Sequence, residues 1–245
     1  MTTRFCVAFV CNFRYLDKFF ETCNALIYVG EYSGPIVLLV GDDINVRALN
    51  ALPFFAKHPQ ILIRQEPDIV LKAIKTINAT NAKCDKFGYK LFQYHKFYLF
   101  TPFFKQWDYV FYIDCGAKIY DCIAPILACA KPGQLVAHSD AYPTYNWKLK
   151  DQFLNSISYN IDYFQTTIML YSTEIIDGYT TFQNLCALAE KHPDSRTNDQ
   201  GIINLAFLNQ WSQMPFGDER KYYYDFCVRH NDKPYIMTKY YVFND

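Results

Sequence analysis

Buried apolar runs alternate with stretches of helical spacing in the first part of the chain. Continuous apolar runs at 5–11, 36–40 and 61–63 are typical of strands covered on both faces. Residues 15–28 and 45–56 lie between these runs and are predicted to be helices. The order strand, helix, strand, helix, strand is the beginning of a doubly wound α/β fold.

The same alternation continues to the end of the chain. The polar, lysine-bearing stretch 66–88 predicts a loop or short helices. The clearest buried strand is Trp107–Asp114, and it follows a predicted helix from about Tyr89 to Phe104 that Pro102 is expected to kink or end. Strands are also predicted at 134–138 and 163–171, and a helix after Asn198. Because neither a repeat nor a linker interrupts this order, we expect one domain.

Composition and charge narrow the functional classes. Lys plus Arg and Asp plus Glu both number 24, so the charge balance gives no sign of a nucleic-acid partner or an anionic membrane. Tyr and Phe number 21 each; they can fill the core or stack on sugar rings. These features leave the oligomeric state open.

Cysteine usage and the N-terminal pattern favour a soluble, cytoplasmic protein. The nine cysteines include no C-x-x-C pair, which argues against a zinc ribbon and a dithiol redox motif. The apolar run 5–10 is too short for a signal peptide, and no run reaches the ~18 apolar residues of a membrane span.

Asp114 is the first candidate for chemistry. It follows the buried run 110–113 and precedes Cys115-Gly116, where the chain can turn tightly. A carboxylate at the end of such a strand lies at the carboxyl edge of the sheet, where open α/β folds bind ligands. The alternative is that Asp114 only caps a turn or helix.

Several motifs, in order along the chain, resemble the GT-A core of glycosyltransferases. The first block joins Lys96-Phe-Tyr-Leu-Phe to the strand that ends in Asp114-Cys-Gly116 and to the segment 123–127. Three later segments resemble the retaining glycogenin-like and bacterial galactosyltransferase-like family: Tyr163-Phe-Gln165-Thr-Thr-Ile-Met-Leu170, Asn198-Asp199-Gln200-Gly-Ile-Ile-Asn204 and His230-Asn-Asp-Lys233-Pro-Tyr235.

The resemblance implies a single GT-A domain over residues 1–245. Residues 1–128 would be the nucleotide-sugar-binding half, and 129–245 the acceptor-side half with a closing tail. The donor would be a nucleoside-diphosphate sugar, UDP first and GDP second, and the acceptor a glycan or protein. The enzyme would be a hexosyl- or pentosyltransferase of glycan biosynthesis from a bacterial, viral or protist source.

The resemblance also assigns roles to single residues. On the donor side, Cys11 and Asn12 would lie near the base and ribose, and Lys96 and Lys233 would contact the donor and its phosphates. Asp114 would face the diphosphate and the metal ion.

The metal ion would be Mn²⁺ or Mg²⁺, with His230 as its second ligand. Gln165, Asp199 and Gln200 would surround the anomeric carbon and the acceptor hydroxyl.

The sequence departs from the family pattern at three places. Gly116 replaces the second aspartate of the D-x-D motif, Gln165 replaces an asparagine, and the tail between His230 and Lys233 is shorter. With one carboxylate fewer, lysine or arginine could supply the positive charge: Lys96, Lys118, Arg229 and Lys233 are candidates. An inverting enzyme would need a carboxylate as general base, and the candidates in order of preference are Asp199, then Asp162 or Asp140.

Other classes fit less well. A nucleotidyltransferase needs a glycine-rich phosphate loop after the first strand, and residues 11–15 contain no glycine. A Rossmann methyltransferase or dehydrogenase needs a G-x-G motif, which the sequence lacks. A GT-A-like protein that has lost catalysis and only binds glycans or partners remains the main alternative because of Gly116.

Overall fold

The structure is a computed structural model. It describes residues 3–80, 91–139, 164–193, 195, 198–214, 225–230 and 233–239. Within these ranges the side chains of 77–80, 139, 225–230 and 233–239 are left out of the description. Asp140, Asp162 and the proposed start of the helix at Tyr89 lie outside the described residues.

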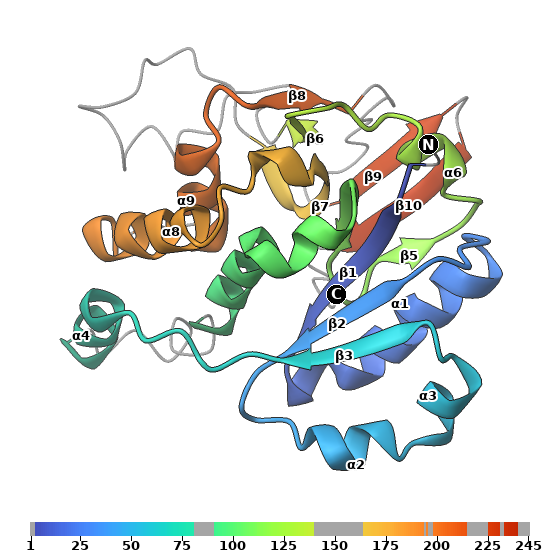
Figure 1. Cartoon of the computed structure of the whole chain (residues 1–245), viewed down its shortest axis with the longest axis horizontal. Helices are drawn as coiled ribbons and strands as arrows, with labels where there is room; N and C mark the ends of the chain where they lie inside the picture. Colours follow the sequence, from blue (N-terminus) through green and yellow to red (C-terminus); the bar gives the residue numbers. More distant parts are fainter. Residues whose placement is uncertain are drawn as a thin grey trace, which may run out of the picture.

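A seven-stranded sheet forms the centre of the molecule (Figure 1), in the order β3-β2-β1-β4-β7-β6-β8. β3, β2, β1 and β4 are parallel neighbours, β7 is antiparallel to both β4 and β6, and β8 is parallel to β6. This is the mixed, mostly parallel sheet that the sequence predicts. The strands are β1 (Phe5–Cys11), β2 (Ile36–Val40), β3 (Ile61–Gln65), β4 (Tyr109–Ile113), β6 (Leu135–Ser139), β7 (Phe164–Ser172) and β8 (Trp211–Gln213).

One face of the sheet is covered by α1, α2, α3 and α6, whose apolar residues share a core cluster with β1 and β2. The helix predicted over 45–56 is in fact two short helices, because Pro53 starts a new helix at its first position. The bounds are η1 (Phe13–Tyr15, a 3₁₀ turn), α1 (Leu16–Tyr28), α2 (Val46–Asn50), α3 (Pro53–Lys57) and α6 (Ala124–Leu127).

The other face is covered by α4, η2, η3, α8 and α9. The helix predicted over 89–104 is instead two 3₁₀ helices, which meet at Thr101 because Pro102 begins the second one. A 3₁₀ helix as long as η2 is uncommon and often marks a functional segment. The bounds are α4 (Lys72–Thr80), η2 (Leu91–Phe100), η3 (Pro102–Gln106), η4 (Thr173–Ile175), α8 (Thr180–Lys191) and α9 (Asp199–Ala206).

A second, three-stranded sheet was not predicted. It consists of β5 (Lys118–Ile119), β10 (Lys233–Lys239) and β9 (Asp225–His230), in that order. β10 pairs with the short strand that follows Asp114 by four residues, so the tail of the chain returns to the neighbourhood of the D-x-D-like motif. None of the helices in the described ranges is long and apolar enough to cross a membrane.

The alternation of side chains along β4 divides the core into two clusters. Val110 and Tyr112 belong to the cluster under η2, whereas Phe111 and Ile113 belong to the cluster under α1. Because successive side chains of a strand point to opposite faces, Asp114 is expected on the side of Tyr112. The residue at the strand end therefore faces η2.

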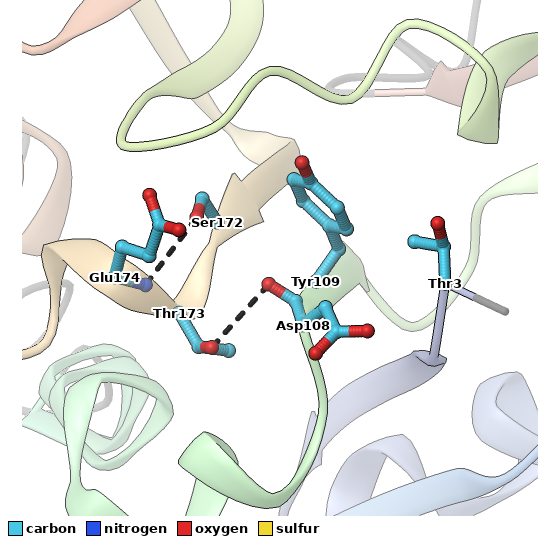
Figure 2. Close-up of a pocket in the computed structure, with 6 residues that line it drawn as sticks. All are labelled: Thr3, Asp108, Tyr109, Ser172, Thr173 and Glu174. Carbon is cyan, nitrogen blue, oxygen red and sulfur yellow. Dashed lines mark hydrogen bonds between the residues drawn. The ribbon is translucent and has the colours of Figure 1, made fainter. Parts of the chain in front are cut away.

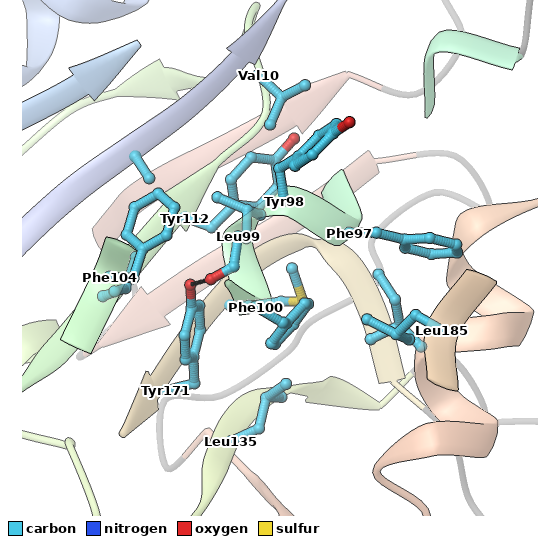
Figure 3. Packing of buried hydrophobic residues seen from close by; sticks show 14 of the residues in the cluster. Val10, Phe97, Tyr98, Leu99, Phe100, Phe104, Tyr112, Leu135, Tyr171 and Leu185 are labelled. Carbon is cyan, nitrogen blue, oxygen red and sulfur yellow. Dashed lines mark hydrogen bonds between the residues drawn. The ribbon is translucent and has the colours of Figure 1, made fainter. Parts of the chain in front are cut away.

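Tyr171 joins the central sheet to η2 inside the first cluster. Its ring is fully buried, and its hydroxyl donates a 2.6 Å hydrogen bond to the carbonyl of Leu99. Figure 3 shows this bond among the packed side chains of Phe97, Phe100 and Phe104. Burial raises the pKa of Tyr171 well above its usual range. The hydroxyl therefore stays protonated and holds η2 against the sheet.

Tyr171→Phe removes this bond and leaves the carbonyl of Leu99 without that donor. We expect the free energy of unfolding to fall by about 1–3 kcal/mol, the cost of an unsatisfied buried polar group. Urea denaturation followed by circular dichroism measures the change. Tyr179→Phe is the matched control, because Tyr179 is 60% exposed and its substitution should change stability by less than about 0.5 kcal/mol. An equal loss in both variants would contradict the assigned role of Tyr171.

Candidate functional site

The carboxyl ends of the parallel strands meet at one edge of the sheet. β1 ends before Asn12, β2 ends before Gly41, and β4 ends before Asp114. Open α/β sheets bind ligands at this edge. Asn12 and Asp114 are predicted from the sequence to lie near a bound donor, and the parallel pairing of β1 with β2 and β4 brings both residues to this edge.

A buried lysine connects two aspartates at this edge. The Nζ atom of Lys96, on η2, lies 3.1 Å from Oδ1 of Asp114 and 3.1 Å from Oδ2 of Asp199, at the start of α9. Nζ also donates a 3.3 Å hydrogen bond to the carbonyl of Thr166 on β7. Side-chain exposure is 8% for Lys96, 4% for Asp199 and 26% for Asp114. Of the three, only Asp114 presents a substantial part of its side chain to solvent.

Tyr112 completes the surroundings of Asp114. Its hydroxyl donates to Oδ1 of Asp114, the same oxygen that Lys96 contacts. Its ring centroid lies 5.3 Å from Nζ of Lys96, within the distance at which a ring face attracts a cation. Tyr112 precedes Asp114 by two positions, so both side chains face η2.

An irregularity in β7 brings Thr166 to the cluster. Ala137 of β6 pairs with Met169, but Ser139 pairs with Phe164, so four residues of β7 face a single residue of β6. Bulges of this kind redirect side chains and are frequent beside active sites. At this point Oγ1 of Thr166 donates a 3.0 Å hydrogen bond to Oδ2 of Asp199.

Asn204 fixes the first turn of α9 to the beginning of β7. Its side-chain oxygen accepts from the backbone N–H of Phe164 at 2.8 Å, and its amide donates to the carbonyls of Phe164 at 2.8 Å and Gln200 at 2.9 Å. The side-chain oxygen of Gln200 accepts from the N–H of Thr166 at 3.4 Å. These bonds hold the α9 start, with Asp199, against the bulged strand.

Asp199 is not the N-cap of α9. The N-cap is Asn198, which has a φ of 51° and whose side chain makes no capping hydrogen bond. A positive φ is uncommon for a residue other than glycine, although asparagine tolerates it better than most. The carboxylate of Asp199 instead contacts Lys96 and Thr166. The carboxylate therefore belongs to the buried cluster and does not cap the helix.

The electrostatics of the cluster follow from burial and charge. Burial alone would lower the pKa of Lys96, but the carboxylates of Asp114 and Asp199 together raise it above the usual range. Burial raises the pKa of Asp199, although Lys96 and the Thr166 hydroxyl favour its charged form. Burial and the adjacent carboxylate of Asp114 raise the pKa of Tyr112 far above its usual value. These contacts therefore favour the charged form of Lys96 and the protonated form of Tyr112, which donates its hydrogen bond to Asp114.

Gly116 occupies the third position of the D-x-D-like motif in an unusual conformation. Its φ is 98°, and a Cβ added there would lie 3.3 Å from Cδ of Lys18 on α1. Its N–H donates a 2.9 Å hydrogen bond to the hydroxyl of Thr22. A side chain at this position would be strained and would point toward Lys18. The turn is thus built for glycine.

The described residues do not by themselves make a metal centre. A divalent cation of this kind needs several oxygen or nitrogen ligands. Among the side chains that the structure describes, no group of three or more His, Cys, Asp and Glu residues could hold one. Asp114 offers a carboxylate, one oxygen of which already accepts from Lys96 and Tyr112. Any further ligands would have to come from outside the described side chains, and His230 is the candidate there.

The backbone of the tail is described, but the side chains of His230 and Lys233 are not. The two residues pair with each other across the β9–β10 hairpin. Because Met237 pairs with Lys118 in an antiparallel ladder, the Lys239 end of β10 points toward the residues that precede Lys118. His230 and Lys233 lie at the opposite end of the hairpin, and their proposed contacts stay predictions.

Cys11 is the last residue of β1 and Asn12 follows it, so both lie at the same edge of the sheet. Cys11 is fully buried, and its thiol donates to the carbonyl of Asn12 at 3.2 Å. The thiol of Cys115, on the neighbouring strand end, donates to the carbonyl of Val10 at 3.5 Å. A hydrogen bond with Cys11 and burial raise the pKa of Cys115 well above its usual range. The Cys115 thiol is therefore a poor nucleophile, and the buried Cys11 is a packing group.

Three buried side-chain oxygens near this edge have no hydrogen-bond partner among the described residues. They are Oδ1 of Asn12, Oε1 of Gln93 and Oγ1 of Thr167. Gln93 precedes Lys96 by one turn of a 3₁₀ helix, where residues three apart lie on one face. The carbonyl of Thr167 accepts from the N–H of Asp114 at 2.8 Å. Buried polar atoms without partners need an explanation, and a ligand with N–H or O–H donors would provide one.

A pocket of about 280 Å³ lies elsewhere, at the other end of β4 (Figure 2). Two of its polar side chains already have partners within the protein: Oγ1 of Thr173 donates to the carbonyl of Trp107 at 2.7 Å, and Asp108 pairs with Arg4 at 3.2 Å. It lies at the amino ends of β1 and β4, opposite to the edge where α/β sheets bind ligands. We therefore place the functional site at Asp114 and not in this pocket.

The structure brings together Lys96, Asp114, Asp199 and Gln200 from the set of predicted residues. Gln165 is half-buried on β7 beside Thr166, within the same bulge. Tyr112 and Thr166 are not predicted as site residues from the sequence. The signal for Tyr112 was available, since it shares a face of β4 with Asp114, whereas the bulge that positions Thr166 has no sequence marker.

No protein-family model matches the chain, and no curated protein matches its sequence. The fold, however, is similar to solved structures. The galactosyltransferase LgtC, in complex with donor and acceptor sugar analogues, has a TM-score of 0.63 at 13% identity, over 85% of this chain and 72% of LgtC.

Two further glycosyltransferases match over similar parts of this chain. GlyE from Streptococcus pneumoniae TIGR4 has a TM-score of 0.53 at 18% identity, over 86% of this chain and 45% of GlyE. The bifunctional glycosyltransferase WbbM has a TM-score of 0.59 at 16% identity, over 88% of this chain and 39% of WbbM. With the mixed sheet and the strand-end aspartate described above, these likenesses show that the chain has the GT-A fold of glycosyltransferases.

Proposed function

We propose that this protein is a glycosyltransferase that moves a sugar from a nucleoside-diphosphate sugar to a hydroxyl group of a glycan or protein acceptor. A UDP-sugar is the favoured donor, and the sugar is a hexose or a pentose. The observation that carries the proposal is the cluster of Asp114, Lys96 and Asp199 at the carboxyl edge of a GT-A sheet.

Two further observations support a sugar nucleotide at this edge. The oxygens of Asn12, Gln93 and Thr167 that lack partners among the described residues are acceptors suited to the N–H of a base and the O–H groups of a ribose or sugar. One similar structure, LgtC, is a complex with donor and acceptor sugar analogues. We infer that the corresponding edge of this chain binds a donor.

The proposed reaction exchanges one bond at the anomeric carbon. The bond from this carbon to the diphosphate oxygen breaks, and its electron pair leaves with the nucleoside diphosphate. The acceptor hydroxyl oxygen forms the new bond and loses its proton. Asp199 is the first candidate to accept that proton if the reaction inverts configuration, and Gln165 and Gln200 would help to orient the sugar or the acceptor.

The divalent cation is a separate proposal. Mn²⁺ or Mg²⁺ would be held by Asp114 and His230, and it would neutralise charge on the leaving diphosphate. Among the described side chains we assign only the carboxylate of Asp114 as a ligand of this ion, so we assign no step of the reaction to the metal.

A binding protein that has lost catalysis is the second candidate. Gly116 favours it, because the second carboxylate of a D-x-D motif is missing and the φ of 98° would strain any side chain placed there. Such a protein would bind nucleotide or glycan at the same edge without turnover.

Cytoplasmic location remains a proposal from the sequence. The cysteines with described side chains are free thiols, which fits a reducing compartment. We expect a microbial or viral source.

Donor turnover tests the proposed function directly. The purified chain is incubated with a panel of UDP- and GDP-sugars, and release of the nucleoside diphosphate is measured, with binding measured by calorimetry. We expect binding in the micromolar to millimolar range. Asp114→Asn should reduce turnover by at least ~10²-fold, the usual effect of losing a preorganised charged group.

Asp108→Asn is the matched control for this experiment, since Asp108 precedes the same strand at its other end and should leave turnover unchanged. Binding without turnover would favour the binding protein. If no nucleoside diphosphate binds, with or without Mn²⁺, the proposed function is wrong.

The metal proposal is tested by chelation. If Asp114 and His230 share a cation, turnover should be lost in EDTA and should return on addition of Mn²⁺ or Mg²⁺. His230→Ala should then need a higher Mn²⁺ concentration for half-maximal rate, because one ligand is missing. Undiminished turnover in EDTA would contradict the metal proposal and would assign charge neutralisation to basic side chains.

A further inference from the structure

The ammonium group of Lys96 has no hydrogen left for a ligand. A lysine ammonium has three N–H donors and no acceptor. The three oxygens within reach are Oδ1 of Asp114, Oδ2 of Asp199 and the carbonyl of Thr166, at 3.1, 3.1 and 3.3 Å. A direct bond from Lys96 to a donor phosphate would require one of these contacts to break.

Asp114 is also the most accessible group of the cluster, since the side chain of Asp199 is only 4% exposed. The side chain of Lys96 is 8% exposed, whereas that of Asp114 is 26% exposed. Burial and the Tyr112 ring, 5.3 Å from Nζ, shield the ammonium on the side of β4. A donor that arrives at the sheet edge therefore meets Asp114 before Lys96.

The charge count also argues against a phosphate contact. Lys96 contributes one positive charge, and Asp114 and Asp199 contribute two negative charges when both are ionised. The cation is thus more than neutralised by its own partners. A lysine whose charge is already neutralised attracts an anionic diphosphate only weakly. The same lysine strongly stabilises two carboxylates that would otherwise repel each other.

The position of Lys96 in the fold indicates a different role. Its three partners come from three separate elements: the end of β4, the bulge of β7 and the first turn of α9. Asp114 lies in the half of the chain that is predicted to bind the nucleotide sugar, and Asp199 in the half that is predicted to face the acceptor. One ammonium group therefore sets the distance between the two carboxylates.

We propose that Lys96 is a positioning residue that fixes Asp199 relative to Asp114 and does not contact the donor. This revises the expectation that Lys96 is a donor-binding residue, and it rests on the proposed glycosyl transfer. The alignment of the acceptor hydroxyl with the anomeric carbon then depends on Lys96 through Asp199, while donor affinity does not depend on it.

The test uses four variants and two measurements. The variants are Lys96→Met, Asp199→Asn, the double variant with both changes, and Lys105→Met. The double variant removes one positive and one negative charge, so the cluster keeps the net charge of the wild type. Lys105 is the matched control, because its Nζ bonds to the carbonyl of Ile176 at 2.9 Å and is not part of the cluster. UDP affinity is measured by calorimetry, and the turnover number and the Michaelis constant by release of nucleoside diphosphate.

The positioning role predicts that the double variant binds UDP within about threefold of the wild-type affinity, because independent contacts change little. Lys96→Met should lower the turnover number by about 10²-fold or more. The double variant should be no slower than Asp199→Asn, since two residues that act as one unit do not add their losses. Lys105→Met should match the wild type in both measurements.

Three results would overturn the proposal. A loss of UDP affinity of about tenfold or more in the double variant would show a direct donor contact. Losses that multiply between the single variants would show that Lys96 acts independently of Asp199. Wild-type turnover in Asp199→Asn would remove the carboxylate through which Lys96 is proposed to act.

A wrong proposed function would give a different result from a wrong role for Lys96. In that case the wild-type chain itself binds no nucleoside diphosphate and releases none from any donor. If Lys96→Met does not fold, the affinity of the charge-balanced double variant still decides between a positioning and a donor-binding lysine. Thermal unfolding by circular dichroism verifies the fold of each variant first.

Discussion

A charged ammonium group buried in a protein must be surrounded by oxygen atoms, and here that requirement connects four parts of the fold. Lys96 of η2 meets Asp114 after β4, the carbonyl of Thr166 in β7 and Asp199 of α9. Removing one partner from a buried ion pair typically costs about 3–5 kcal/mol, because the other charge is left uncompensated. The arrangement of the site and the stability of the surrounding fold therefore depend on the same contacts.

Four other features of the structure position the partners of the Lys96 ammonium group. The alternation of β4 turns Tyr112 and Asp114 toward η2, and the bulge of β7 turns Thr166 toward α9. Asn204 ties the first turn of α9 to Phe164. Tyr171 holds η2 against the central sheet. These contacts leave one carboxylate, that of Asp114, partly exposed at the carboxyl edge of the parallel strands, whereas Lys96 and Asp199 are buried.

The sequence predicts the sheet well and the site in part. Apolar runs locate β1, β2 and β4 because strands buried on both faces need continuous apolar residues. Asp114 and Asp199 stand out because each directly follows or begins an element. The 3₁₀ form of η2, the bulge of β7 and the β9–β10 hairpin depend on contacts between distant segments, which leave no local pattern. The partnership of Lys96 with both aspartates could not be read from spacing, since Asp114 lies 18 positions after Lys96 and Asp199 lies 103 positions after it.

A crystal structure of the chain with bound UDP tests the central claim most directly. The account predicts the diphosphate at the carboxyl edge of β1 and β4, beside Asp114, with Nζ of Lys96 still within hydrogen-bond distance of Asp114, Thr166 and Asp199. Two results would contradict it: UDP bound in the pocket at the other end of β4, or a Lys96 ammonium that has left Asp199 to contact a phosphate oxygen.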